Sequence, residues 1–71
     1  MSYQIDILAG ENWSEFANTH QKENARRIAN MLLKDNYVVR ISQITSGFEL
    51  GDIEYPDGKV VSSKDLYNDV L

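Results

Sequence analysis

The sequence predicts an α+β domain of two layers, in which a small, mostly antiparallel sheet is covered on one face by one long helix. Three observations indicate this class: one stretch with the period of an amphipathic helix, several short β-branched stretches, and turn residues between them. The 71 residues suffice for one domain with a small core, which we place at 1–71. The expected order of elements is β-α-β-β-β-α.

The long helix is the most strongly patterned element, and we place it from Thr19 to Asn36. Its apolar residues recur at i, i+3, i+4 and i+7, which puts them on one stripe of a helix. These residues are Ala25, Ile28, Ala29 and Leu32. Asn36 suits the left-handed residue that commonly ends a helix. We expect the stripe to make the main contact with the sheet.

The stretch before it, Glu11 to Asn18, has the form of a helix start. Asn12 and Glu15 stand three residues apart, as in a capping box. Two arrangements are open. The helix breaks near Asn18 and Thr19, or one helix of about 24 residues carries two apolar faces.

Aromatic residues of this region form a second stripe on such a helix. Trp13, Phe16 and His20 fall at i, i+3 and i+7, out of phase with the main apolar stripe. Exposed aromatic side chains favour protein interfaces, so these three are candidates for partner binding.

The first strand is predicted from Tyr3 to Ala9, where residues alternate between two faces. Tyr3, Ile5 and Ile7 share the face that we expect to be buried. We expect this strand to run parallel to the second strand, through a right-handed crossover that the helix makes.

Three further strands are predicted as an antiparallel meander, at Tyr37 to Thr45, Phe48 to Tyr55 and Lys59 to Val61. Ser46-Gly47 and Pro56-Asp57-Gly58 provide the turns, the second of type I. The alternation slips at Gly51, which indicates a β-bulge.

A final short helix is predicted from Ser63 to Leu71. Ser62 would cap it, with Asp65 three residues further on. Its apolar contacts would be Leu66, Val70 and Leu71.

Composition excludes several classes of site. The chain has no cysteine and one histidine, so disulfides, thiolate metal sites and sites with several histidines from one chain are excluded. The formal net charge of −4 disfavours generic binding to nucleic-acid phosphates. No secretory signal or membrane-spanning run is recognisable, and we expect a cytoplasmic protein.

The carboxylates of Asp52 and Glu54 form a pair with possible chemistry. They lie two residues apart on one strand, about 7 Å along one face. Paired carboxylates can hold Mg²⁺ or act as acid and base, but two alone do not define a site. We therefore predict no catalytic residue, no metal site and no cofactor, and we do not expect an enzyme.

The function that fits best is a small acidic protein-interaction module: a regulator, an inhibitor or an assembly subunit. The partner would be another protein, with a homodimer also possible. The expected contacts are the aromatic stripe and an acidic rim. The rim comprises Asp52, Glu54, Asp57, Asp65 and Asp69.

Two alternatives remain open from the sequence. One is a nucleic-acid-binding domain that uses the basic residues of the helix and the following strand. Those residues are Lys22, Arg26, Arg27 and Arg40. The other is a metal-dependent enzyme subunit built on Asp52 and Glu54.

Overall fold

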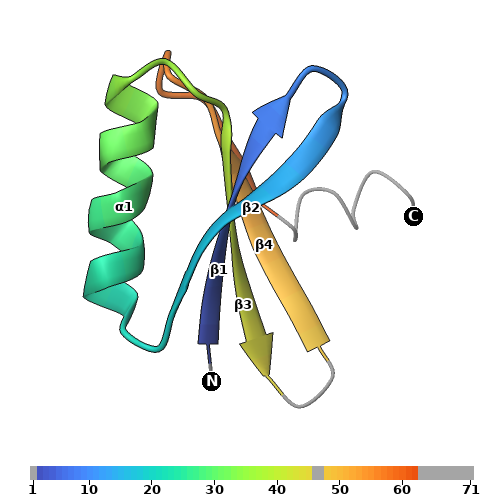
Figure 1. Cartoon of the computed structure of the whole chain (residues 1–71), viewed down its shortest axis with the longest axis vertical. Helices are drawn as coiled ribbons and strands as arrows, with labels where there is room; N and C mark the ends of the chain where they lie inside the picture. Colours follow the sequence, from blue (N-terminus) through green and yellow to red (C-terminus); the bar gives the residue numbers. More distant parts are fainter. Residues whose placement is uncertain (1, 46–47, 63–71) are drawn as a thin grey trace.

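The computed structural model describes residues 2–45 and 48–62, which form a five-stranded antiparallel sheet with one helix on one face (Figure 1). The strand order is β2-β1-β3-β4-β5. The elements are β1 (Ser2–Ala9), β2 (Asn12–Thr19), α1 (Lys22–Lys34), β3 (Val39–Thr45), β4 (Phe48–Glu54) and β5 (Val60–Ser62). The predicted α+β class with a helix-covered sheet is confirmed, and so is the meander of its last three strands.

The predicted helix start at Glu11 to Asn18 is wrong. Glu11 lies in a turn, and the residues after it belong to strand β2. β2 pairs with β1 as a hairpin around Gly10 and Glu11. Gly10 has a φ of 65°, and glycine with positive φ at the first central position is typical of a type II′ hairpin turn. The spacing of Asn12 and Glu15 therefore caps no helix.

A bulge in β2 explains why its residues resemble a helix in sequence. The register shifts between Ile5 and Asp6 of β1. Ile5 pairs with Ala17 and Asp6 pairs with Glu15, so that Phe16 is the extra residue of β2. The extra residue inverts the alternation of the strand. Apolar residues of β2 are therefore spaced as on a helix although they lie on different faces of a sheet.

The parallel pairing expected for the first strand is also wrong. β1 runs antiparallel to both its neighbours, β2 and β3. The reason is that β2 reverses the chain before α1 begins. The helix therefore connects β2 to β3, and β1 lies between these two strands.

The predicted apolar stripe of the helix forms the core. Ala25, Ala29 and Leu32 are buried against Ile5 of β1 and Val39 of β3, and Ile28 packs beside them. The two alanines let α1 approach the sheet closely.

The end of α1 also follows the prediction. Asn36 has a φ of 71°. The amide of Tyr37 donates to the carbonyl of Leu32, and the amide of Asn36 donates to that of Leu33. This pattern is a Schellman motif.

The bulge predicted at Gly51 is wrong, because β3 and β4 keep one register from Val39 to Thr45. Asp52 and Glu54 are opposite Ile41 and Val39 in the ladder, so they occupy the helix side of β4, and Ile53 occupies the other side. The main contacts of α1 are with β1, β2 and β3, and it reaches β4 through the ion pair of Arg26 with Glu54. The alternation of apolar and polar residues in β4 changes at Gly51 because the burial of its two faces changes along the strand. The pairing of β3 with β4 is continuous.

The turn at Pro56-Asp57-Gly58 is confirmed. The amide of Gly58 donates to the carbonyl of Tyr55 at 3.0 Å, and Gly58 has a φ of 98°. The predicted turn at Ser46-Gly47 and the predicted helix from Ser63 to Leu71 lie outside the described residues.

We predict that Leu32→Ala lowers the free energy of unfolding by about 2–5 kcal/mol, because it leaves a cavity in a small core. The side chain is 3% exposed. Urea denaturation followed by circular dichroism measures the change. The adjacent variant Met31→Ala is the control, since Met31 is 51% exposed and should change the stability by no more than about 0.5 kcal/mol. Equal losses in both variants would contradict the core described above.

Candidate functional site

The face of the sheet opposite α1 carries an apolar residue on every strand. Ile5 and Val39 point toward α1, so their neighbours along β1 and β3 point away from it. The registers extend this face to β2, β4 and β5. Its apolar residues are Leu8, Trp13, Ile44, Ile53 and Val61, all of intermediate exposure. We call this surface the helix-free face.

An ion pair lies at the centre of the helix-free face. Asp6 of β1 and Arg40 of β3 are directly opposite each other in the ladder. Oδ2 of Asp6 accepts hydrogen bonds from Nε and Nη2 of Arg40 at 3.1 and 3.0 Å. Oδ1 accepts one from Nε2 of Gln4 at 2.9 Å. The Asp6 side chain is 2% exposed and that of Arg40 is 31% exposed, so a buried carboxylate is held by three charge-assisted hydrogen bonds.

Trp13 stacks on this ion pair. Cζ of Arg40 lies 4.6 Å from the centroid of the Trp13 ring. A guanidinium over an indole face is attracted by the electrons of the ring. The pair with Asp6 holds the guanidinium in place, and the guanidinium lies over the Trp13 ring.

Small residues lie beside the ion pair. Ser42 of β3 pairs with Gly51 of β4. A Cβ at Gly51 would lie 3.0 Å from Oγ of Ser42 and 3.3 Å from the carbonyl oxygen of Ile41, so a larger residue there would displace its neighbours by a few tenths of an ångström. Ser42 is 1% exposed, and its hydroxyl has no hydrogen-bond partner in the described part of the chain.

On the other face, a pocket of about 310 Å³ opens between α1 and the sheet. It is lined by Tyr3, Lys22, Ala25, Arg26, Ile41, Gln43 and Asp52. Arg26 donates to both oxygens of Glu54, at 2.9 and 2.6 Å. These hydrogen bonds raise the pKa of Arg26 above its ordinary value, against the opposing effect of burial. The positive charge of Arg26 at this pocket is therefore balanced by the carboxylate of Glu54.

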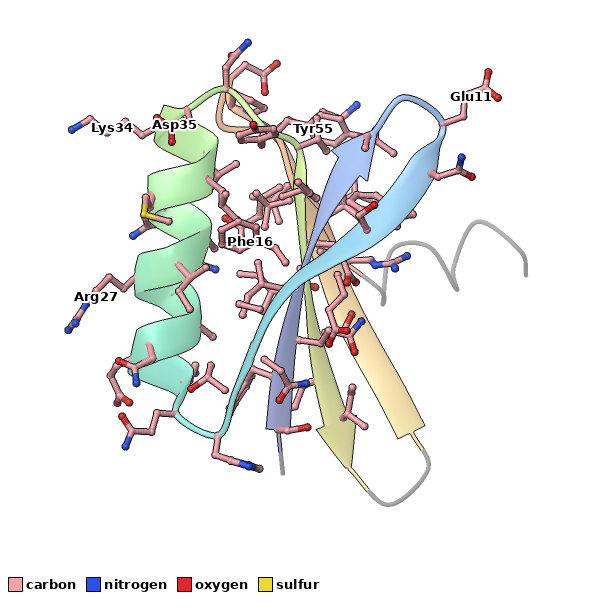
Figure 2. All side chains as sticks on the ribbon, in the orientation of Figure 1. Glu11, Phe16, Arg27, Lys34, Asp35 and Tyr55 are labelled. Carbon is pink, nitrogen blue, oxygen red and sulfur yellow. The ribbon has the colours of Figure 1, made fainter. Side chains whose placement is uncertain are left out.

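The aromatic residues predicted to bind a partner do not form one stripe. Trp13 lies on the helix-free face. Phe16, at the bulge, is 48% exposed, and Figure 2 shows it on the side of β2 toward α1. His20 is exposed in the connection between β2 and α1. The predicted aromatic stripe depends on helical spacing, and it does not form because Trp13 and Phe16 belong to strand β2.

The predicted acidic rim is divided as well. Asp52 and Glu54 lie on the helix side of the sheet, with Glu54 paired to Arg26. Oδ1 of Asp57 accepts the amide of Lys59 at 2.9 Å, so this carboxylate stabilises its own turn. Asp65 and Asp69 lie outside the described residues.

The basic residues weighed for nucleic-acid binding are partly neutralised. Arg26 and Arg40 are in ion pairs with Glu54 and Asp6, while Lys22 and Arg27 are exposed. Among residues 2–45 and 48–62, no three acidic or histidine side chains are placed to hold a metal ion together. α1 is too short and too polar to cross a membrane.

The Asp6–Arg40 pair was missed in the sequence because Asp6 occupies a polar position of an alternating strand. One signal was present. Leu8 follows Ile7 on β1, and on β3 Ile44 has the opposite parity to Val39 and Ile41. Apolar residues at both parities indicate that both faces of a strand are covered.

Comparison of the chain with protein-family models, with curated proteins and with solved structures finds no match. The function is therefore argued from the helix-free face itself.

We predict that Arg40→Met lowers the free energy of unfolding by about 3–5 kcal/mol, because it leaves the buried Asp6 carboxylate without its cation. The matched control is Arg26→Met, which breaks an ion pair whose arginine side chain is 48% exposed. Solvent screens that pair, and its loss should cost no more than about 1 kcal/mol. Chemical denaturation of the two variants measures both values. A smaller loss for Arg40→Met than for Arg26→Met would contradict the central role of the buried pair.

Proposed function

We propose that this chain is a small cytoplasmic protein-interaction module that binds a protein partner through the helix-free face and catalyses no reaction. The observation that carries the proposal is the presence of an apolar side chain on each of five adjacent strands, on the face that α1 does not cover.

The spread of these apolar residues over all five strands supports binding. Single exposed apolar residues are ordinary, whereas a contiguous apolar patch with polar neighbours marks an interaction surface. Leu8 and Trp13 are paired across β1 and β2, and Ile53 and Val61 across β4 and β5. Apolar side chains therefore lie on both sides of the central Asp6–Arg40 pair, from β2 at one edge of the sheet to β5 at the other.

The residue types at the centre support it too. Tryptophan and arginine are enriched among the residues that dominate binding energy in protein interfaces. Trp13 is already oriented by Arg40, and Arg40 by Asp6. Contacts that order side chains before binding reduce the entropy that a complex costs.

Charge indicates the kind of partner. The chain carries a formal charge of −4, and Glu15 is exposed beside Asp6 on the same face. A partner with an apolar centre and a cationic rim would be complementary to this surface. A regulator, an inhibitor or an assembly subunit acts by such binding alone.

Two adjacent valines of β5 provide a matched test. Val61 lies on the helix-free face, and Val60 lies on the opposite face and is 54% exposed. We predict that a photo-reactive amino acid at position 61 gives a discrete protein adduct in the native cell, and that the same group at position 60 does not. With the adduct partner purified, Val61→Arg should weaken the Kd by about tenfold or more, the equivalent of 1.4 kcal/mol.

Thermal melting of Val61→Arg and Val60→Arg separates lost binding from lost folding. Equal adducts from both positions, or an equal loss of affinity in both arginine variants, would refute binding through the helix-free face.

A further inference from the structure

The contact between α1 and the sheet opens at the first turns of the helix. On the helix side of β3, Val39 is buried, whereas Ile41 and Gln43 further along the strand are of intermediate exposure. On β1, Ile5 is buried and Tyr3 is of intermediate exposure. Burial under α1 therefore decreases toward this end of the sheet. The pocket of about 310 Å³ lies here, on the side of the sheet opposite the helix-free face.

Residues of the helix and of three strands form the walls and the floor of this pocket. Lys22, Ala25 and Arg26 stand at i, i+3 and i+4 of α1, which places them on one side of the helix. Opposite them, Ile41 of β3 is paired with Asp52 of β4. Ala25 is 2% exposed and Ile41 packs against the core, so these two residues give the pocket an apolar floor. Sites for small molecules usually enclose about 300–1,000 Å³, so this pocket suits a small ligand.

The charged groups at the pocket are of both signs, and two of them are unpaired. Arg26 is paired with Glu54. Lys22 on the helix and Asp52 on the sheet form no ion pair with each other or with any other residue among 2–45 and 48–62. The helix wall therefore offers an unpaired cation and the sheet wall an unpaired carboxylate, with the apolar floor beside them.

This combination favours a ligand that carries charges of both signs. An ammonium group donates charge-assisted hydrogen bonds to a carboxylate such as that of Asp52, and a ligand carboxylate accepts them from an amine such as that of Lys22. With Glu54 counted beside Arg26, the site carries two positive and two negative charges. A ligand without net charge therefore matches the site, whereas a ligand with one charged group would use only one of the two unpaired side chains.

We propose that this pocket binds a small zwitterion of the class of free α-amino acids. Its carboxylate binds Lys22, its ammonium group binds Asp52, and an apolar side chain packs on Ala25 and Ile41. Because Lys22 and Asp52 are exposed to solvent, each contributes modestly, and the expected affinity is in the millimolar range. The proposal goes beyond protein binding and is tested without a protein partner.

Three matched probes separate the two charges of the ligand. L-Norleucine carries both, hexanoate is the same carbon chain without the ammonium group, and pentylamine lacks the carboxylate. In the isotope-labelled full chain, norleucine should shift the amide signals of Ala25 and Arg26 until they saturate, and leave those of Lys34 and Asp35 at the other end of α1 unchanged. Hexanoate and pentylamine should each bind about fivefold more weakly. Absence of saturation by norleucine, or equal affinity for either single-charge probe, would overturn the proposal.

Two variants assign each charge of the ligand to its side chain. Asp52→Asn should weaken norleucine binding about fivefold, to the affinity of hexanoate for the native chain, and leave hexanoate binding unchanged. Lys22→Gln should weaken it to the affinity of pentylamine and leave pentylamine binding unchanged. The charge-matched controls are Glu23→Gln and Arg27→Gln, which lie on α1 outside the pocket lining and should leave norleucine binding unchanged.

All four substituted positions are exposed, and thermal melting establishes that each variant is folded. Equal losses of norleucine affinity in the controls and in the pocket variants would mean that the ligand responds only to net charge, and the proposal would fail. Loss of hexanoate binding in Asp52→Asn would refute the assigned roles. Val61→Arg, which tests the helix-free face, should leave norleucine binding unchanged, so the two proposals can fail separately.

Discussion

The structure depends on the coverage of β1 on both of its faces. Ile5 and Asp6 are consecutive residues, and both are buried, one under α1 and one within the ion pair with Arg40. A strand in this position requires a neighbour on each side and material above and below. The pairings with β2 and β3 provide the neighbours, α1 covers one face, and the Arg40 side chain, paired with Asp6, lies on the other.

Much of this arrangement could be predicted, since α1 and the last three strands carry strong local signals. The stripe containing Ala25 and Leu32 repeats at helical spacing, and the turn at Pro56 is set by local residue types. β2 could not be predicted in the same way. Its bulge at Phe16 replaces the alternation of a strand by a spacing that resembles a helix. Because β2 was not recognised as a strand, the antiparallel pairing of β1 could not be predicted either.

The candidate site was only partly visible in the sequence. The sequence predicts that Trp13 binds a partner, but from a helical stripe that does not exist. The ion pair that orients it joins residues 34 positions apart. Such a contact depends on the register of two strands, which local patterns leave open. β4 shows the same limit. Asp52 lies on the side of the sheet toward α1 and Ile53 on the side away from it, and the local sequence pattern leaves this choice open.

The bulge at Phe16 has a further consequence for the outer border of the sheet. β2 is an edge strand of eight residues, and its outer amides and carbonyls are not used by any neighbouring strand of the described sheet. A straight edge of that length is a template on which identical chains stack into fibres. The extra residue bends this border, and the negative charges of Glu11 and Glu15 repel an approaching copy. Bulges and charged side chains of this kind are features that disfavour edge-to-edge pairing of folded chains.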